Sequence, residues 1–299
     1  MKIHFYKYQG AGNDFIIIDG RKDHIELSHK EIQFMCNRRF GIGADGLMII
    51  GSDPSADFTM HYYNADGKEG TMCGNGGRCL VACAASKNVA RYIFSAIDGI
   101  HHAEVITRRG CESLIRLGMN NVDQIDRYYD NGFYLNTGSP HLVLFESEVS
   151  VIDVALRGAL LRNHPDFAPK GTNVNFVEIK SDNALFVRTF ERGVEEETFS
   201  CGTGVTAAAI AAHLYNKRED GNYTYHIYTL GGDLQLSFTT KKGRFYDVQL
   251  TGPATFVFEG EWQKGRKGDP SRQANCKLTN KVSNKHRIEV GRDDTTRKF

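Results

Sequence analysis

Two short segments of this 299-residue chain have nearly the same sequence: Cys-Gly-Asn-Gly at 73–76 and Cys-Gly-Thr-Gly at 201–204. We call these segments the elbows. Each elbow leads into an alanine-rich run with almost no charge, 76–86 and 204–215, whose composition favours a helix. A helix that is apolar on every side has to be buried. The fold must therefore enclose two helices, each preceded by a cysteine.

A second pair of segments repeats with a similar offset. Gly-Asn-Asp at 12–14 and Gly-Ser-Pro at 138–140 lie 126 residues apart, against 128 for the elbows, and the order is kept. These repeats indicate an internal duplication. We predict an α+β fold with two similar halves. Each half is a mostly antiparallel or mixed β-sheet wrapped around one buried central helix, with the active site in the cleft between the halves.

Local patterns predict a strand-rich chain with isolated helices. Ser28 and Glu31 have capping-box spacing, which predicts a helix over 29–39. Alternating apolar residues predict short strands at 3–6, 15–18, 47–50, 58–63, 105–107 and 114–117.

The repeats also suggest where the halves begin and end. We assign 1–122 to the N-terminal half, completed by a strand near 252–262, and 123–251 to the C-terminal half. Residues 263–299 carry 11 Lys and Arg against 4 Asp and Glu with few large apolar residues, so we predict a disordered basic tail. A nucleic-acid-binding arm is less favoured, because the segment lacks interleaved aromatic residues.

Composition narrows the classes of function. With 37 basic and 36 acidic residues the formal charge is +1, so no global field attracts nucleic acid or an anionic membrane. Seven cysteines are too few for a disulfide framework in a chain of this length. With no apolar stretch typical of a signal peptide or a membrane span, we expect a cytoplasmic protein.

The string Gly-Ile-Gly-Ala-Asp-Gly at 41–46 matches the dinucleotide-binding fingerprint. In that fingerprint the glycines join a strand to a following helix, whose N-terminus faces the pyrophosphate. Here they follow the predicted helix and precede a strand. We therefore predict that this segment binds no dinucleotide.

The elbows favour acid–base chemistry on an anion. A helix N-terminus offers free N–H groups to a carboxylate, and it lowers the pKa of a thiol beside it. If the halves face each other, Cys73 and Cys201 flank one bound carboxylate, so one can remove a proton while the other delivers one to the opposite face.

Other interpretations of the cysteines remain open. A zinc site would need four ligands, and only Cys73, Cys79 and Cys83 cluster. A disulfide between Cys73 and Cys201 could form on oxidation, although no C-x-x-C motif is present. A lone nucleophile with a histidine and an acid would leave the repetition unexplained. Ordinary core packing best fits the cysteines with no glycine elbow, Cys36, Cys79, Cys83 and Cys111.

With its elbows and other motifs, the chain resembles the diaminopimelate epimerases, which are cofactor-independent amino-acid epimerases. The resemblance covers residue 1 to about 262. Its motifs stand at 10–15, 41–46, 64–67, 73–78, 138–141, 171–173, 191–193, 201–204 and 252–254. It implies conversion of LL-2,6-diaminoheptanedioate to its meso form in lysine and cell-wall precursor synthesis. It also implies no cofactor, no metal and a homodimer.

The resemblance also implies roles for single residues. Cys73 and Cys201 match the two acid–base cysteines, and His141 and Glu191 match positions that tune their pKa values. Backbone amides of Gly74, Asn75, Gly202 and Thr203 would hold the reacting carboxylate. The other implied substrate contacts are Asn13, Asn64, Asn173, Glu191 and Arg192.

Some of these residues have simpler interpretations, and two positions depart from the family pattern. Asn13 and Asn64 also suit turns, and Glu191 with Arg192 could be a surface ion pair. Ser139 stands where many members have Asn, and Gly46 stands where some have Gln.

Two alternative functions remain at this point. One is a sister racemase or dehydratase of another small amino acid, such as a proline racemase; the other is a non-catalytic redox or binding protein. The set Asn64, Asn173, Glu191 and Arg192 favours a substrate with a second polar end. We expect a small diamino dicarboxylate as the partner, with neither nucleic acid nor a membrane.

Overall fold

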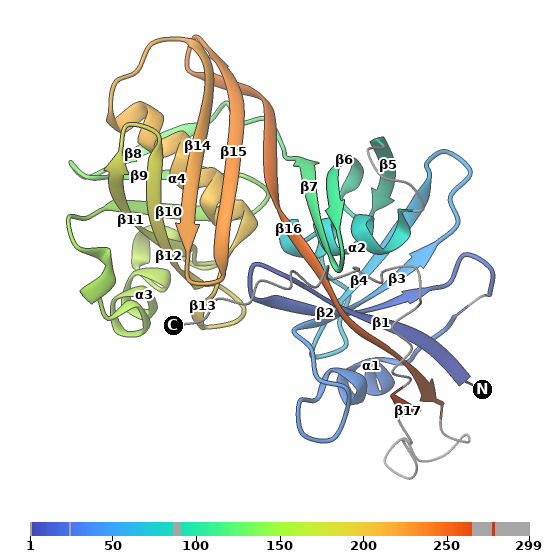
Figure 1. The fold of residues 1–299 in the computed structure, drawn as a ribbon. Coiled ribbons are helices and arrows are strands. Elements are labelled where there is room, and N and C mark those ends of the chain that lie inside the picture. The colour runs from blue at the N-terminus through green and yellow to red at the C-terminus, as the bar shows by residue number, and fades with distance from the viewer. Residues whose placement is uncertain (1, 24, 86–90, 265–276, 279–299) are drawn as a thin grey trace, which may run out of the picture.

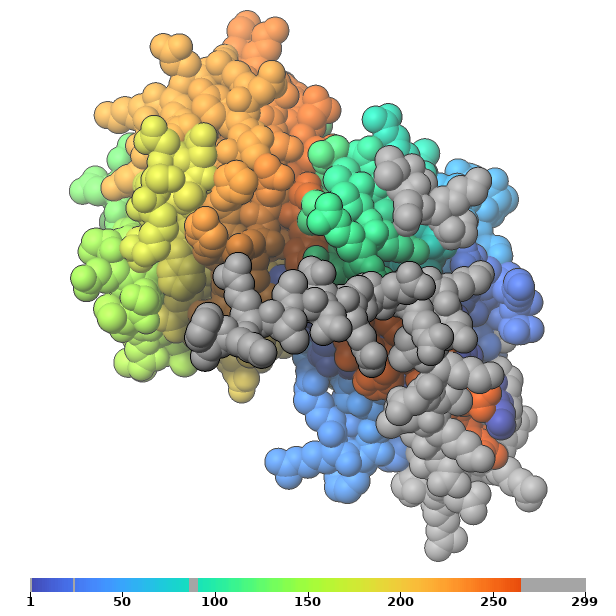
Figure 2. All heavy atoms as spheres, viewed as in Figure 1, coloured from blue at the N-terminus to red at the C-terminus, as the bar shows by residue number. Residues whose placement is uncertain are grey.

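The computed structural model describes residues 2–23, 25–85, 91–264 and 277–278. It has two lobes joined by one long strand, β16 (Arg244–Gln263) (Figure 1). In Figure 2 the first lobe runs from blue to blue-green and includes the orange-red end of β16, and the second lobe runs from green through yellow to orange. This is the predicted α+β fold of two similar halves.

In the first lobe, strands surround helix α2 (Gly74–Ala84), and a second helix, α1 (His29–Cys36), packs on the other face of the sheet. The strands are β1 (Lys2–Gly10), β2 (Asn13–Asp19), β3 (Gly46–Gly51), β4 (Phe58–Asn64), β5 (Arg91–Ala96), β6 (Gly99–Arg109) and β7 (Glu112–Gly118). Successive side chains of β2 point to opposite faces of the sheet, so Phe15 and Ile17 pack with α2 on one face. Ile16 and Ile18 pack with α1 on the other.

The second lobe repeats this arrangement around helix α4 (Gly202–Tyr215), with α3 (Val154–Arg162) on the opposite face. Its strands are β8 (Ile125–Tyr128), β9 (Gly132–Asn136), β10 (Pro140–Phe145), β11 (Asn173–Ser181), β12 (Ala184–Glu191), β13 (Glu196–Thr198), β14 (Gly221–Thr229) and β15 (Gly232–Lys241). In β10, Val143 packs toward α4 and Leu142 packs toward α3.

Strand pairing shows the duplication more clearly than the sequence does. In the first lobe β2 runs parallel to β3 with α1 between them in the chain, and in the second β10 runs parallel to β11 with α3 between them. Each lobe then adds an antiparallel strand, β4 or β12. The next strand after the central helix then pairs in parallel with this antiparallel strand: β5 with β4 in the first lobe, and β14 with β12 in the second.

Strand β16 links the two lobes. It pairs with β15 over 244–251, with β7 over 252–255 and with β1 over 255–263. The first lobe is thus completed by a strand from the C-terminal part of the chain.

The two central helices are buried as predicted. Ten of the eleven residues of α2 and eleven of the fourteen of α4 are buried. Helix α1 has the predicted capping box, in which the Ser28 N–H donates to Glu31 Oε2 at 2.8 Å. It ends at Cys36, three residues before the predicted end, because Asn37 is extended and its Oδ1 accepts hydrogen bonds from the N–H groups of Arg39 and Phe40.

Most of the predicted tail lies outside the described residues. Its first residue, Gln263, ends β16, and Lys264 donates to the Glu26 carbonyl oxygen at 2.7 Å. A short strand, β17 (Lys277–Leu278), pairs with β16 at 260–261. These described parts of the tail contact the first lobe, and disorder stays a prediction for the rest.

Candidate active site

The two elbows meet where the lobes join. Cys73 and Cys201 are the N-cap residues of α2 and α4, and both have extended backbones. A Cβ atom built on Gly202 would lie 3.2 Å from the Gly74 Cα atom, and one built on Gly74 would lie 3.4 Å from the Gly202 Cα atom. The two helix N-termini therefore approach each other backbone to backbone, and a side chain at Gly202 would fit only if the backbone near Gly74 shifted.

This contact brings two sets of free helix N–H groups together. The first turn of a helix has N–H groups without intrahelical partners, and the helix dipole favours negative charge there. The four predicted backbone donors, at Gly74, Asn75, Gly202 and Thr203, stand at these two ends. An anion bound between the ends would receive hydrogen bonds from both halves.

The Cys73 thiol faces Asn13. Its S–H donates to Asn13 Oδ1, with 3.6 Å between sulfur and oxygen. Burial raises the pKa of Cys73, and the Glu191 charge raises it further; the N–H groups of Gly76 and Asn75 and the Arg78 guanidinium act to lower it. The net result is a protonated thiol at neutral pH.

Cys201 is also protonated at neutral pH. Burial is the largest cause of its raised pKa, followed by the nearby Glu191 charge. Two groups act to lower this pKa. One is Thr203, whose Oγ1 lies 3.5 Å from the Cys201 Sγ, and the other is the Gly204 N–H.

Our prediction that the helix N-termini lower the thiol pKa values below their usual range is therefore wrong for this state of the site. The N–H groups act in the predicted direction, but the loss of hydration outweighs them. A reaction at this site needs a group that takes a proton from one of the thiols.

Glu191 is placed to take that proton. It ends β12 and accepts a hydrogen bond from Thr198 Oγ1 at 3.1 Å. Burial raises its pKa, and hydrogen bonds from Thr198 and Cys201 act to lower it. Moving a proton from Cys201 to Glu191 shifts a charge within a contacting pair and creates no additional buried charge.

His141 is held as a neutral ring in one tautomer. The Asn175 Nδ2 atom lies 3.0 Å from the Leu142 carbonyl oxygen, which can only accept, so this atom is the donating nitrogen of the amide. Nδ2 also lies 3.1 Å from His141 Nδ1, which must then accept and carry no proton. Burial lowers the pKa of His141 to about 3.

The remaining ring proton of His141 points toward an elbow. Nε2 lies 2.9 Å from Thr203 Oγ1 and 3.0 Å from Ser139 Oγ. Thr203 Oγ1, which accepts from His141, can donate its own proton to Cys201 Sγ. His141 thus acts on Cys201 through the Thr203 hydroxyl.

The amide of Asn13 is oriented by a cluster of charges. Its Nδ2 donates to Asp45 Oδ2 at 2.6 Å, which turns Oδ1 toward Cys73. Arg38 pairs with Asp45 at 2.6 Å and with Asp14 at 2.7 Å, and Asp14 pairs with Lys7 at 2.7 Å. Asn13 therefore favours the protonated form of Cys73.

The other predicted substrate residues differ in whether their polar side-chain groups are already used in hydrogen bonds within the protein. Asn173 is 3% exposed, and its amide is fully used: Nδ2 donates to Ser139 Oγ and the Pro140 carbonyl, and Oδ1 accepts the Arg192 N–H. Asn64 is exposed at the end of β4, opposite Gly46. Among the described residues no ion pair engages the Arg192 guanidinium, whose contact is to the Lys170 carbonyl at 3.4 Å.

Sequence reasoning missed several residues that hold this site together: Asp45, Arg78, Asn175 and Thr189. Asn175 had a detectable signal, since residues 173 and 175 of one strand point to the same face. Thr189 completes its amide by donating to Oδ1 at 3.0 Å. Only tertiary packing reveals the parts played by Asp45 and Arg78.

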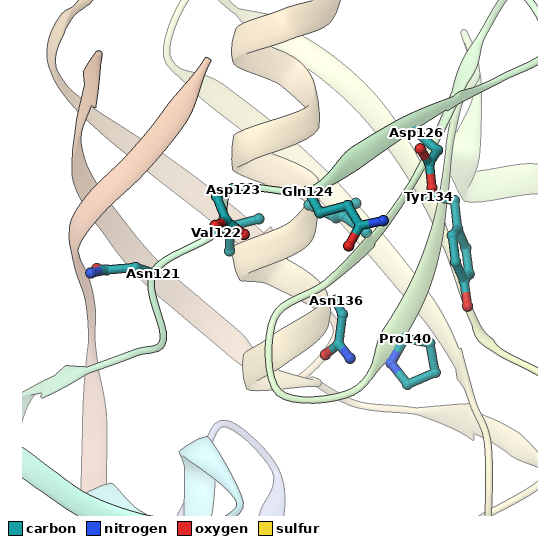
Figure 3. A pocket seen from close by; sticks show the side chains of 9 residues that line it. Asn121, Val122, Asp123, Gln124, Asp126, Tyr134, Asn136 and Pro140 are labelled. Atoms are coloured by element: carbon teal, nitrogen blue, oxygen red, sulfur yellow. The ribbon is translucent and has the colours of Figure 1, made fainter. Parts of the chain in front are cut away.

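The elbows are distinct from the pocket in Figure 3. This pocket of about 280 Å³ lies behind the turn that precedes β10, and no cysteine or basic side chain is among its lining residues, Asn121, Val122, Asp123, Gln124, Asp126, Tyr134, Leu135, Asn136 and Pro140. Its chemistry does not suit a dicarboxylate.

Within the described ranges, no three His, Cys, Asp or Glu side chains gather where they could hold a metal ion.

Fold comparison defines the class of protein. The structure is similar to a phenazine biosynthesis protein of the PhzF family from Bacillus anthracis, with a TM-score of 0.69 and 16% identity over 87% of this chain and 99% of that one. It is also similar to a hydroxyproline epimerase from Agrobacterium vitis, with a TM-score of 0.64 and 14% identity over 87% and 92% of the two chains. The protein therefore has the two-lobed fold that these proteins share.

Sequence comparison is more specific. A family model described as diaminopimelate epimerase matches residues 5–107 and 133–257. The diaminopimelate epimerase of Flavobacterium psychrophilum is 47% identical over 85% of this chain and 98% of its own length, and that of Chlorobaculum tepidum is 40% identical over 84% and 98%. The chain belongs to the diaminopimelate epimerase family, and it is an isomerase.

Proposed function

We propose that the protein interconverts LL-2,6-diaminoheptanedioate and its meso form without a cofactor, using Cys73 and Cys201 as the two acid–base groups. One sulfur, as thiolate, takes the proton from the α-carbon. The other, as thiol, gives its proton to the opposite face of the same carbon. The observation that most supports this proposal is the contact between Gly74 and Gly202, because it brings together the helix N-termini that follow the two cysteines.

The difficult step is removal of an α-proton beside a carboxylate, because negative charge then develops on the substrate. Donors already aimed at that charge need no reorganisation, and one such donor is worth about 3 to 4 kcal/mol in other enzymes. The N–H groups of both elbows supply donors of this kind. Burial strengthens their effect because little water competes.

The contacts of the two thiols differ, and this difference suggests their starting states. Cys201 can pass its proton to Glu191 and become the thiolate, and the Thr203 hydroxyl then donates to the sulfur. Cys73 donates to the Asn13 amide oxygen, which favours the thiol. In the starting enzyme both thiols are protonated. Cys201 becomes the base when Glu191 takes its proton, Cys73 serves as the acid, and the roles are exchanged after turnover.

Recognition of the substrate's second amino-acid group depends on free polar side chains farther from the elbows. Arg192 offers a guanidinium that no described carboxylate pairs with, which suits a distal carboxylate. Asn173 acts indirectly, because its amide fixes the Arg192 backbone. A substrate without the second carboxylate, such as proline, would leave Arg192 unused.

Incubation of the LL substrate in heavy water without added cofactor tests the activity. We expect deuterium at the α-carbon and formation of the meso product. A panel of amino acids tests the substrate: faster turnover of proline or hydroxyproline than of LL-2,6-diaminoheptanedioate would contradict our choice. No deuterium incorporation from any of them would leave the redox or binding alternative.

Replacement of Glu191 tests the proton acceptor. We expect E191Q to lower kcat/KM by roughly tenfold, since Cys201 loses its partner. In the wild type, activity should rise with pH through the raised pKa of Glu191, because the carboxyl must lose its proton before it can accept one from Cys201. E195Q is the control, because Glu195 is exposed and pairs with Arg162. An unchanged pH profile in E191Q would contradict this role.

We also propose a homodimer, which the resemblance to the family implies, and a cytoplasmic location. In the described part of the chain, no helix combines the length and apolar character needed to cross a bilayer. Sedimentation equilibrium of the full chain measures the oligomeric state directly.

A further inference from the structure

Arg78 is a fully buried arginine that the mechanism described so far does not use. Its side chain is 0% exposed and is among the largest completely buried side chains in the protein. It lies one turn into α2, directly behind the first elbow. A buried guanidinium normally has an anionic partner, because removing the charge from water is costly.

Within the described residues, no carboxylate pairs with this guanidinium. Its contacts are neutral oxygens: NH1 donates to the Gly74 carbonyl at 3.2 Å, NH2 donates to Asn75 Oδ1 at 2.8 Å, and Nε donates to the Pro253 carbonyl at 3.4 Å. These three acceptors give each guanidinium nitrogen one hydrogen-bond partner, but they do not neutralise the charge.

The contact with Asn75 links Arg78 to both elbows. Because Asn75 Oδ1 accepts from the guanidinium, its Nδ2 faces the other way and donates to the Ser200 carbonyl at 2.9 Å. Ser200 is the residue directly before Cys201. Arg78 therefore fixes an amide that ties the start of α2 to the start of α4.

The positive charge of Arg78 lies close to the titratable groups of the candidate site. On its own helix the groups that act on it are Cys73 and Cys79, and β16 presents only the Pro253 carbonyl to it. The groups that interact with Cys73 from other elements are Glu191 of β12, Tyr62 of β4 and Cys201 at the start of α4. Arg78 is the one cation among these groups.

We propose that Arg78 is a positioning residue for the paired elbows: it holds Asn75 across the junction and supplies the permanent positive charge that offsets negative charge formed there. This inference rests on the proposed function. The anions concerned are the substrate carboxylate, the charge that develops on it when the α-proton leaves, and the Cys73 thiolate that remains when Cys73 gives up its proton.

The experiment compares R78M, R78K and R108M in the full chain. R78M removes the charge. R78K keeps the charge, but an ammonium group cannot make the paired guanidinium hydrogen bonds to the Gly74 carbonyl and Asn75 Oδ1. R108M is the matched control, because Arg108 donates to the carbonyls of Ala82 and Ala85 at the other end of the same helix. If R78M does not fold, R78Q replaces it, since glutamine also lacks the charge and can still donate to Asn75.

Two readouts are measured. The first is kcat and KM for the LL substrate. The second is the rate at which iodoacetamide alkylates Cys73 as a function of pH, with mass spectrometry identifying the alkylated residue. We expect R78M to lower kcat by at least about tenfold and to shift the Cys73 alkylation profile about one unit to higher pH. R78K should restore the alkylation profile but only part of kcat. R108M should leave both unchanged.

An R78M profile that coincides with the wild-type profile would overturn the proposal, because it would leave Arg78 only a packing role. So would an R108M shift as large as that of R78M. The alkylation readout needs no turnover, so it remains informative even if the wild-type chain fails to incorporate deuterium and the proposed function is wrong.

Discussion

Replacing either elbow cysteine with alanine should abolish epimerisation, with a loss of about 10³-fold or more in kcat/KM for both C73A and C201A. Each thiol serves one face of the α-carbon, so neither can substitute for the other. The two losses should not add in the double variant, because the cysteines act as one unit. Conversion of LL substrate to the meso form, followed by chiral chromatography, measures the effect.

The matched controls are C79A and C83A. Cys79 and Cys83 lie on α2 with Cys73, but they pack in the core of the first lobe. Burial raises the pKa of Cys79 to about 12, and Cys79 lies inside α2, not at the helix N-terminus where Cys201 contacts Glu191. We expect these variants to keep turnover within a few-fold of the wild type. Full activity in C73A or C201A would refute the two-thiol mechanism.

The sequence predicted the parts of the fold that are repeated or locally coded. The elbows predicted α2 and α4, and the Ser28 and Glu31 pair predicted the start of α1. Helix α3 was missed because Leu156 and Leu160 are exposed, so its apolar residues do not mark the buried face. The full length of β16 was also not predicted, because Gly252 and Pro253 break its pattern where it changes partners.

The sequence predicted where the candidate acid–base residues lie, but not the electrostatics around them. It predicted a helix directly after each of the two cysteines, and the structure has both helices. It could not give the cost of burying the thiols, which depends on every residue packed around them and which reverses the expected pKa direction. Asn173 shows the same limit, since only the structure reveals that its amide is used within the protein.

The duplicated fold explains why the two elbows lie together, which the proposed action on a single carbon requires. Each central helix is held by the sheet of its own lobe, and β16 pairs with strands of both lobes. The elbows are therefore carried by rigid elements instead of mobile loops, as a preorganised site requires. The two thiols have different neighbours, Asn13 and Glu191, and in the proposed mechanism this difference makes Cys73 the first acid and Cys201 the first base.

Substitution of Gly204 should have the second largest effect, because it damages the support of the Cys201 elbow. A Cβ atom built on Gly204 would lie 2.4 Å from Asn175 Oδ1, so the Asn175 amide must move. Asn175 is 0% exposed and holds His141, the Leu142 carbonyl and Thr189 by hydrogen bonds. We expect G204A to lose about 10²-fold in kcat/KM, since a displacement of this size misaligns Thr203 and Cys201.

G204A should also lower the free energy of unfolding by about 1 to 3 kcal/mol, measured by urea denaturation, because the core is overpacked and buried polar groups lose partners. G77A on α2 is the control: its Cβ would meet the Leu117 and Met72 side chains at 3.2 Å, and these can adjust. Since G204A acts through Asn175, its effect and that of N175A should be less than additive in the double variant. Strict additivity, or wild-type activity in G204A, would show that this amide does not support the site.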